Sequence, residues 1–448
     1  MSLGALGLKR HILVLVAGLG TGLSLISCGG LGPSLHPVDR VVASQGVTAT
    51  FSQGSLVIID GLYDTLPRVN QFSAGTSPSL MAISPSRNVL AAFDASSNTV
   101  FGEDTIKETS LGAAHLSGPT ISMVVPTASQ LGYAAVPSAS ATGYSFTGAV
   151  QVMNFALPGS ITTTIAVNNA QTVVSNGTGS QLLVFSNDSN SVTVLNPGNA
   201  VPVVDTSCLT NPPNAVCTII PGFDRPVFAV INGNTAYILN CGAECGGVQA
   251  SVQTLDLTTL AVGTPLPVNG ATDAFLSGSQ LYVAGNGTPT GPLCTSIASA
   301  APTAATYCGT LDIVDLNTMT DPYYNNPAME IAIPDGYHWR IDMSANGQLF
   351  VGSRMCTDIG NVNNPVGEVR GCLAIYNTTN NTVLFPPDNG DVVGLQSFTT
   401  RDIEYVAEGG YLRVYDTTRN VLLINDFLPQ GTINVIGYVG DVKAIDFF

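Results

Sequence analysis

Residues 226–257 read PVFAVINGNTAYILNCGAECGGVQASVQTLDL, and this stretch decides the fold. Two runs that alternate apolar and polar residues flank the turn residues Asn232 and Gly233. Alternation with a period of two indicates strands, and an Asn-Gly step between two such runs indicates a hairpin. A loop with two cysteines follows, and VQTLDL supplies a third strand that ends at a polar residue. A short turn at 258–259 then leads to a fourth strand.

The same arrangement recurs along the chain. Similar units begin near residues 79, 120, 167, 272, 338 and 397, with a spacing of 41–66 residues. Repeats of four strands at this spacing predict an all-β fold, a β-propeller. Residues 47–69 supply three strands without an innermost one, and DVKAIDFF at 441–448 supplies an innermost strand without partners. Pairing these two segments closes the ring and removes its open edges, which gives eight units, with seven blades as the alternative.

Several short motifs resemble the YVTN-type repeat propellers of bacteria. They are the Ser84-Pro85 turn after a strand, Asn98-Thr99-Val100, Val192-Thr193-Val194-Leu195, and strand endings of the form Leu/Val-x-x-x-Asp. The resemblance covers residues 47–448 and implies that this range is one propeller domain. Propellers of this kind are mostly binding scaffolds, so the resemblance implies binding more than any defined reaction.

The N-terminus resembles the signal peptide of bacterial lipoproteins. Lys9 and Arg10 precede an apolar run over residues 12–26, which is too short to span a bilayer but suits a signal peptide. The run ends in Leu25-Ile26-Ser27-Cys28, similar to a lipobox, which implies lipid on Cys28 and a place in the bacterial cell envelope. We therefore expect a signal peptide at 1–27, a flexible tether at 28–46 and a membrane as partner. An ordinary secretory signal with a chance cysteine is the alternative.

Composition narrows the functions further. The net charge is −16, and without Lys9 and Arg10 only 12 basic residues remain against 30 acidic ones. Phosphate backbones bind to clustered positive charge, so nucleic acid is not an expected partner. We expect a monomer that binds a protein or a small anionic or glycan ligand.

Eight cysteines lie between residues 208 and 372, and in an exported chain they predict disulfides. Pairs of sequence neighbours are favoured because each would close one local loop: Cys208–Cys217, Cys241–Cys245, Cys294–Cys308 and Cys356–Cys372. The long connections at 137–148, 285–309 and 353–371 follow the second strand of a unit, which defines a long-loop face. We expect all four disulfides on this face, where they preorganise loops for binding or, alternatively, protect them from proteolysis.

The same face gathers much of the scarce positive charge. Arginines that begin or end strands there have aromatic and histidine neighbours, and together they predict a site for a carboxylate, phosphate or acidic glycan. The candidate ligand-binding residues are Arg225, Tyr337, His338, Trp339, Arg340, Arg354 and Arg370. The alternative is internal pairing of these arginines with Asp224, Asp335, Asp358 and Glu368.

Signals for catalysis are weak, and we assign no catalytic residue, metal ligand or cofactor. No Ser-His-Asp or Cys-His set can be assembled, and no HExxH spacing occurs. Asp273 and Asp342 on innermost strands would allow calcium in the channel, although no carboxylate-rich motif supports it. A metal-dependent hydrolase similar to propeller lactonases or phytases is thus one alternative to a binding module. A structural envelope protein is the other.

Overall fold

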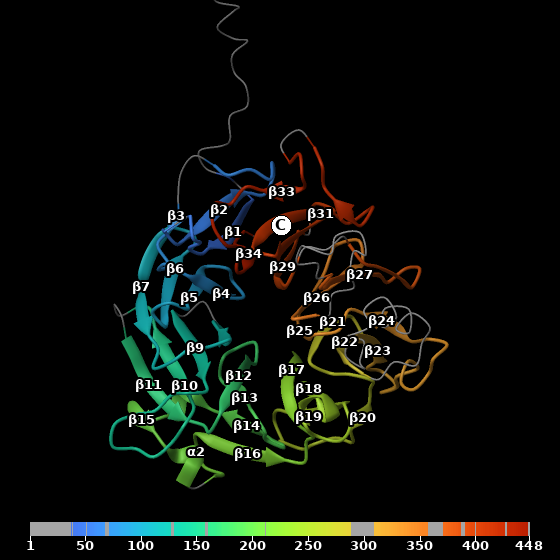
Figure 1. Ribbon diagram of the computed structural model, residues 1–448. Coiled ribbons are helices and arrows are strands. Elements are labelled where there is room, and N and C mark those ends of the chain that lie inside the picture. The colour runs from blue at the N-terminus through green and yellow to red at the C-terminus, as the bar shows by residue number, and fades with distance from the viewer. Residues whose placement is uncertain are drawn as a thin grey trace, which may run out of the picture.

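The chain forms a closed ring of eight sheets (Figure 1). The computed structural model describes residue 37 and residues 39–446, except 51, 68–70, 127–129, 157–159, 211, 288–308, 357–370, 387–389, 399 and 426–427. Each sheet has four or five strands and forms one blade. The predicted all-β propeller of eight units is confirmed, and the seven-blade alternative is wrong.

The strands of each blade are given from the channel outward. Blade 1 contains β34 (Val442–Ala444), β1 (Arg40–Gln45), β2 (Ser55–Asp60) and β3 (Gln71–Phe72); blade 2 contains β4 (Pro78–Ile83), β5 (Val89–Asp94), β6 (Thr99–Asp104) and β7 (Thr109–His115). Blade 3 contains β8 (Ser122–Val124), β9 (Leu131–Val136), β10 (Ala149–Asn154), β11 (Ser160–Ala166) and β15 (Val203–Asp205); blade 4 contains β12 (Ala170–Ser175), β13 (Leu182–Ser186), β14 (Ser191–Leu195) and β16 (Cys217–Pro221).

The second half of the ring continues in the same order. Blade 5 contains β17 (Pro226–Asn232), β18 (Thr235–Asn240), β19 (Ser251–Asp256) and β20 (Leu266–Pro267); blade 6 contains β21 (Asp273–Ser277), β22 (Gln280–Asn286), β23 (Gly309–Asp315) and β24 (Ile331–Ile333). Blade 7 contains β25 (Tyr337–Met343), β26 (Gln348–Arg354), β27 (Leu373–Asn377) and β28 (Thr382–Leu384); blade 8 contains β29 (Val392–Phe398), β30 (Ile403–Glu408), β31 (Tyr411–Asp416) and β32 (Val421–Leu422), with β33 (Thr432–Ile433) beside β31. Short helices occupy Pro197–Asn199, Ser207–Thr210 (α2) and Gly242–Cys245.

The two ends of the chain close the ring in blade 1, as predicted, but with a different N-terminal strand. The partner of β34 is β1 at Arg40–Gln45, which the sequence had assigned to the tether, so the propeller begins at Arg40 and not at residue 47. Val41, Val42 and Ala43 are all buried, because a strand second from the channel packs on both faces and shows no alternation.

The core is divided among the blade interfaces. The described residues form eight hydrophobic clusters, and each cluster joins one pair of neighbouring blades. In β22, for example, Leu281 and Val283 pack against blade 5, whereas Tyr282 and Ala284 pack against blade 7. Successive side chains of a strand point to opposite faces, so each central strand contributes to two interfaces.

The connections define two faces of the ring. The long-loop face carries the connections from second to third strand and from blade to blade, and the opposite, hairpin face carries the turns from first to second and from third to fourth strand. Gly233 and Gly278 occupy the first position of two-residue hairpin turns with φ of +59°, which favours glycine. The predicted hairpins of blades 5 and 6 are therefore present, with each turn one residue later than expected, at 233–234 and 278–279.

Three of the four predicted disulfides are present: Cys208–Cys217, Cys241–Cys245 and Cys356–Cys372. Cys294 and Cys308 lie outside the described residues. Disulfides are typical of proteins outside the cytoplasm. Among the described residues, no helix is long and apolar enough to cross a membrane.

The expected position of Cys208–Cys217 is wrong. The sequence suggested a blade-to-blade connection on the long-loop face, but β16 begins at Cys217 and is the outermost strand of blade 4. The disulfide therefore lies in the connection from third to fourth strand, on the hairpin face. This connection is long because β15 leaves blade 4 to pair in parallel with β11 of blade 3.

Candidate functional site

The innermost strands share an irregularity near their first residues, on the long-loop face. Five of them contain a register shift there, in β4, β12, β17, β25 and β29, which leaves one residue of each without a ladder partner. These residues are Ser79, Gln171, Val227, Trp339 and Val393. A bulge turns the side chains that follow it, and bulges are frequent beside binding sites. The backbone is therefore specialised around the mouth of the central channel.

The bulge in blade 7 places Trp339 beside two arginines. The guanidinium carbon of Arg354 lies 3.5 Å from the centroid of the indole ring, and that of Arg340 lies 3.8 Å from it. Both guanidinium groups therefore contact the same indole ring, within the range of a cation–π interaction. The indole Nε1 donates a hydrogen bond to the carbonyl oxygen of Val392 at 2.8 Å, which anchors this stack to blade 8.

The two arginines of the stack lack carboxylate partners among the described residues. Arg340 donates hydrogen bonds to the carbonyl oxygens of Val393, at 3.1 Å, and of Trp339, at 3.0 Å, and to no carboxylate of the described residues. The Nε of Arg354 is buried without a hydrogen-bond partner in the described part of the chain. Burial, followed by the charge of Arg340, lowers the pKa of Arg354. Two positive charges thus lie close together, and the described residues satisfy only part of their hydrogen-bonding capacity.

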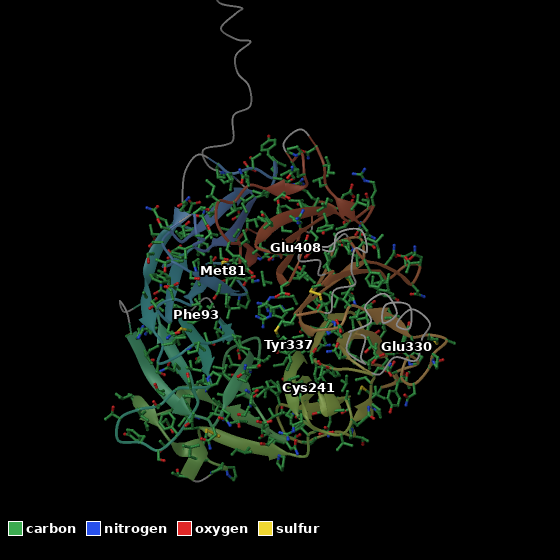
Figure 2. All side chains as sticks on the ribbon, viewed as in Figure 1. Met81, Phe93, Cys241, Glu330, Tyr337 and Glu408 are labelled. Atoms are coloured by element: carbon green, nitrogen blue, oxygen red, sulfur yellow. A yellow bond between two sulfur atoms is a disulfide. The ribbon has the colours of Figure 1, made fainter. Side chains whose placement is uncertain are left out.

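Tyr337 and two carboxyl groups border this stack. Figure 2 shows Tyr337 beside the central opening of the ring, and its ring centroid lies 5.8 Å from the guanidinium carbon of Arg354. Burial raises the pKa of Asp273 to about 7, although Arg340 opposes the shift. Burial also raises the pKa of Glu244 to about 7, although hydrogen bonds from the backbone and side chain of Asn286 oppose the shift. Near neutral pH, both acids are therefore only partly charged, and Asp391 is a further carboxylate whose charge acts on Arg354.

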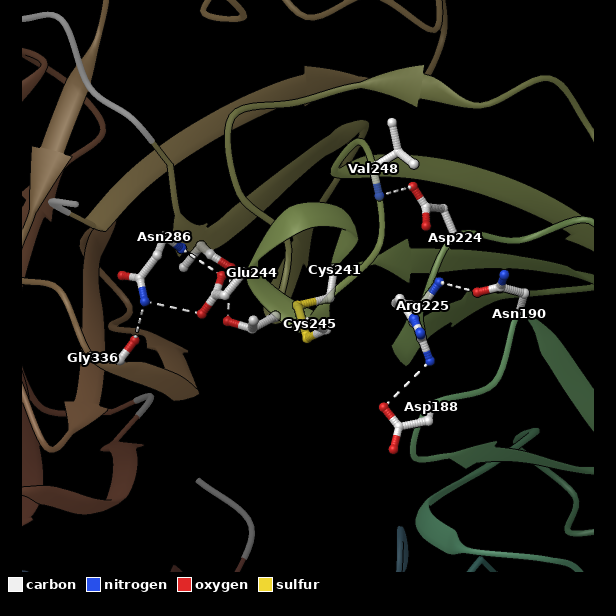
Figure 3. Close-up of a disulfide and its surroundings, with 12 residues drawn as sticks. Asp188, Asn190, Asp224, Arg225, Cys241, Glu244, Cys245, Val248, Asn286 and Gly336 are labelled. Atoms are coloured by element: carbon white, nitrogen blue, oxygen red, sulfur yellow. Dashed lines mark hydrogen bonds and ion pairs between the residues drawn. A yellow bond between two sulfur atoms is a disulfide. The ribbon is translucent and has the colours of Figure 1, made fainter. Parts of the chain in front are cut away.

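Arg225 lies on the far side of Cys241–Cys245 from Glu244 (Figure 3). Its Nη1 lies 3.4 Å from Oδ1 of Asp188 in the neighbouring blade 4. Its sequence neighbour Asp224 instead accepts hydrogen bonds from the backbone nitrogens of Val248 and Gln249, at 2.8 and 2.7 Å. Internal pairing therefore describes Arg225, with a partner that the sequence did not indicate. Among the described residues no ion pair is found for Arg340 or Arg354, and the proposed partners Asp358 and Glu368 lie outside them.

The Cys241–Cys245 disulfide positions Glu244 in a chain of hydrogen bonds that connects blades 5, 6 and 7. It closes the short helix Gly242–Cys245, and from this helix Glu244 reaches blade 6 (Figure 3). The carboxylate oxygens of Glu244 accept hydrogen bonds from the backbone nitrogen of Asn286, at 2.8 Å, and from its Nδ2, at 3.0 Å. The same Nδ2 donates to the carbonyl oxygen of Gly336 at 2.8 Å, immediately before β25. The disulfide loop thus braces the strand that carries Tyr337.

Two cavities continue from the mouth into the channel. The outer one has a volume of about 520 Å³ and is lined by residues that include Gln171, Arg225, Cys245 and Tyr337. The inner one has a volume of about 560 Å³ and is lined by residues that include Arg340, Asp342 and Lys443. Ile121 lines both, so the two cavities are neighbours.

His338 lies apart from the other predicted site residues. It is fully buried, its Nε2 lies 2.8 Å from the carbonyl oxygen of Pro334, and burial lowers its pKa to about 4. The bulge at Trp339 is the reason: His338 packs beside Gly309 of blade 6, whereas Arg340 lies on the side of blade 8. Arg370 and Cys28 lie outside the described residues.

Three residues of the mouth were not predicted: Gln171, Asp188 and Glu244. Gln171 and Asp188 come from blade 4, and nothing in the local sequence indicates that a ring brings them beside Arg225. Glu244 lies between two cysteines that pair, which was the available signal. In the described part of the chain, no group of three or more His, Cys, Asp or Glu side chains could hold a metal ion.

No protein-family model and no curated protein sequence matches this chain. Solved structures do resemble it. The dihydro-heme d1 dehydrogenase NirN, in complex with DHE, aligns with a TM-score of 0.56 at 10% identity, over 92% of this chain and 77% of that one. Hydrazine synthase of Kuenenia stuttgartiensis aligns with a TM-score of 0.50 at 13% identity, over 76% of this chain and 96% of that one. At these identities the likeness shows a shared β-propeller fold and nothing about ligand or activity.

Proposed function

We propose that this protein is an extracytoplasmic β-propeller, held on a membrane by lipid at Cys28, that binds an anionic ligand at its channel mouth. The observation that carries the binding proposal is the stack of Arg340 and Arg354 on Trp339, which has no carboxylate partner in the described structure. Both arginines are half-buried, and a charge that is partly removed from water without a partner is costly, so an anion from solution would stabilise it.

The shape of the site narrows the ligand class. Guanidinium groups recognise carboxylates and phosphates by paired hydrogen bonds, and stacking on the indole fixes their planes before binding. Arg340 lines the inner cavity of about 560 Å³ and Tyr337 the outer one of about 520 Å³, and either volume admits a small molecule or the end of an acidic glycan. The ligand is therefore a carboxylate, a phosphate or an acidic sugar that contacts Arg354 and Arg340 beside Tyr337.

Replacing Arg354 by Gln is expected to weaken binding of the anion by about 10- to 100-fold, which corresponds to the loss of one charged hydrogen bond. Trp339 is the only tryptophan, so its fluorescence reports on the site directly. We would titrate inorganic phosphate, citrate and oligogalacturonate into the purified propeller. Arg354→Lys should keep part of the affinity, since it retains the charge but loses the planar stack.

The matched control is Arg419→Gln, which removes an exposed arginine paired with Asp416 on the hairpin face and should leave affinity unchanged. Thermal unfolding of each variant establishes that it is folded. If none of the three probes binds to the unaltered protein, or if Arg354→Gln binds as tightly as the unaltered protein does, the anion site is wrong.

The Cys28→Ser variant is expected to move from the membrane fraction to the soluble fraction, because the lipid is attached through the thiol. In a bacterial host fed an alkyne-labelled fatty acid, the unaltered protein should carry the label and Cys28→Ser should not. Cys245→Ser is the control, since this cysteine lies in a disulfide of the propeller. An unlabelled wild-type protein, or a membrane-bound Cys28→Ser variant, would contradict the anchor.

A further inference from the structure

The N-terminal strand of the propeller, β1, begins on the hairpin face. Arg40, the first residue of β1, pairs with Asp446 and Glu108, at 2.6 and 2.7 Å between nitrogen and oxygen. The backbone nitrogen of Gly61, in the turn from third to fourth strand of blade 1, donates to the carbonyl oxygen of Asp39 at 2.6 Å. Both neighbours of this junction are therefore hairpin turns, those of blades 1 and 2.

The candidate binding site lies on the other face. Tyr337 begins β25 and Arg354 ends β26, so both are at the long-loop end of blade 7. The first residue of β1 and the binding site are thus separated by the full height of a blade. A strand of six residues such as β1 is about 20 Å long, at ~3.3 Å per residue.

The length of the tether restricts which face of the ring can contact the bilayer that holds Cys28. Twelve peptide units separate Cys28 from Arg40, so the two residues can be at most about 40 Å apart. To bring the long-loop face onto the anchoring bilayer, this segment would have to pass two strand spacings and the height of a blade, about 30 Å. That path takes up about three quarters of the maximum length, and holding a chain so extended costs conformational entropy.

Apolar side chains surround the junction on the hairpin face. Leu62 and Tyr63 are 50% and 42% exposed in the turn beside Asp39, and Ile106 is 68% exposed in the turn beside Arg40. The charged groups there are largely paired, as in Arg401 with Asp64 at 2.7 Å. Exposed aliphatic and tyrosine side chains suit the interfacial zone of a bilayer.

We propose that the hairpin face around Arg40 rests on the bilayer that holds Cys28, and that the channel mouth opens into the aqueous space on the opposite side. The inference depends on the proposed lipid anchor and adds the orientation of the site. The ligand then arrives from solution, and it is not a headgroup of the anchoring bilayer.

Trp339 provides the test, since it is the only tryptophan and lies at the channel mouth. The full-length lipidated protein is reconstituted on vesicles of phosphatidylethanolamine and phosphatidylglycerol that contain a headgroup-nitroxide lipid. Its fluorescence is compared with that of a matched variant, Tyr63→Trp with Trp339→Phe, which moves the tryptophan to the hairpin face. We expect the lipid nitroxide to quench the moved tryptophan and not Trp339, and aqueous acrylamide to retain access to the channel mouth.

Each other result overturns the orientation. Quenching of Trp339 would place the site against the bilayer, whether or not the moved tryptophan is also quenched. If neither is quenched although the protein floats with the vesicles, the hairpin face is not in contact with the lipid. A lipidated protein that does not float refutes the anchor itself, while phosphate, citrate and oligogalacturonate binding by the same preparation still tests the site independently.

Discussion

Deletion of residues 441–448 is expected to remove most of the stability of the propeller, because this segment supplies the innermost strand of blade 1. Val442 and Ile445 are buried, and each contributes about 1.5–3 kcal/mol through the apolar surface that it removes from water. The deletion also leaves the backbone nitrogen of Met81 without its partner, Oδ2 of Asp441 at 2.8 Å. Together these losses are comparable with the whole stability of a typical domain, about 5–15 kcal/mol.

The deletion also exposes β1 as an open edge in the middle of the ring. Val41, Val42 and Ala43 pair with β34 in the closed structure, and an unpaired apolar edge promotes association between copies. Thermal unfolding by circular dichroism and the apparent mass in solution would measure both effects. A peptide of residues 438–448 should restore the transition, whereas the same peptide with Val442→Asp should not. A truncated chain with the wild-type melting temperature would refute ring closure as the source of stability.

The sequence was sufficient to predict the repeated unit of the fold, because side chains that alternate between two blade interfaces leave a period of two. Prediction of strands from the sequence failed where this alternation is absent or misleading. The run Val41-Val42-Ala43 is buried on both faces and therefore does not alternate, so the sequence assigned it to the tether and not to a strand. In blade 4, the connection before the fourth strand, Cys217–Pro221, contains β15, which pairs with blade 3. The local sequence does not show that a segment pairs with a neighbouring blade.

The candidate site was predictable where its members share one blade, as Tyr337, Trp339, Arg340 and Arg354 do. Their clustering follows from pairing within the hairpin of β25 and β26. His338 was placed wrongly beside Arg340, because spacing of two predicts a shared face and the bulge at Trp339 separates them. Asp188 was missed because its approach to Arg225 depends on how two blades meet, which is a property of the closed ring.

Glu103→Gln is expected to stabilise the protein at pH 8 by an amount on the order of 4 kcal/mol and to have little effect below pH 4.5. Glu103 lies on β6, and alternation turns it toward blade 1, away from Phe155 of blade 3. Its side chain is 1% exposed, and neither carboxyl oxygen has a hydrogen-bond partner of good geometry among the described residues. Burial raises its pKa from 4.5 to about 8, although the hydroxyl of Ser110 lowers it in part.

The direction of the pH dependence follows from this shift. Below the unfolded pKa, the carboxyl is protonated in both states and costs nothing. Between pH 4.5 and about 8, the unfolded chain releases the proton while the folded chain retains it, so the free energy of unfolding falls by about 1.4 kcal/mol per pH unit. Above pH 8 the penalty is constant, and glutamine at this position never incurs it.

The neighbouring residue on the same strand provides the control. Asp104 is hydrogen-bonded by the backbone nitrogens of Ile106 and Lys107, and its pKa is lowered despite some burial. Stability from Asp104 is therefore present above its unfolded pKa and lost in acid, so Asp104→Asn should cost stability at pH 8, the opposite sign to Glu103→Gln. Urea unfolding at pH 5, 7 and 8.5 would measure both variants against the unaltered protein. A difference between Glu103→Gln and the unaltered protein that does not change with pH would mean that Glu103 is charged in the folded state, and that its position under blade 1 is more polar than the structure indicates.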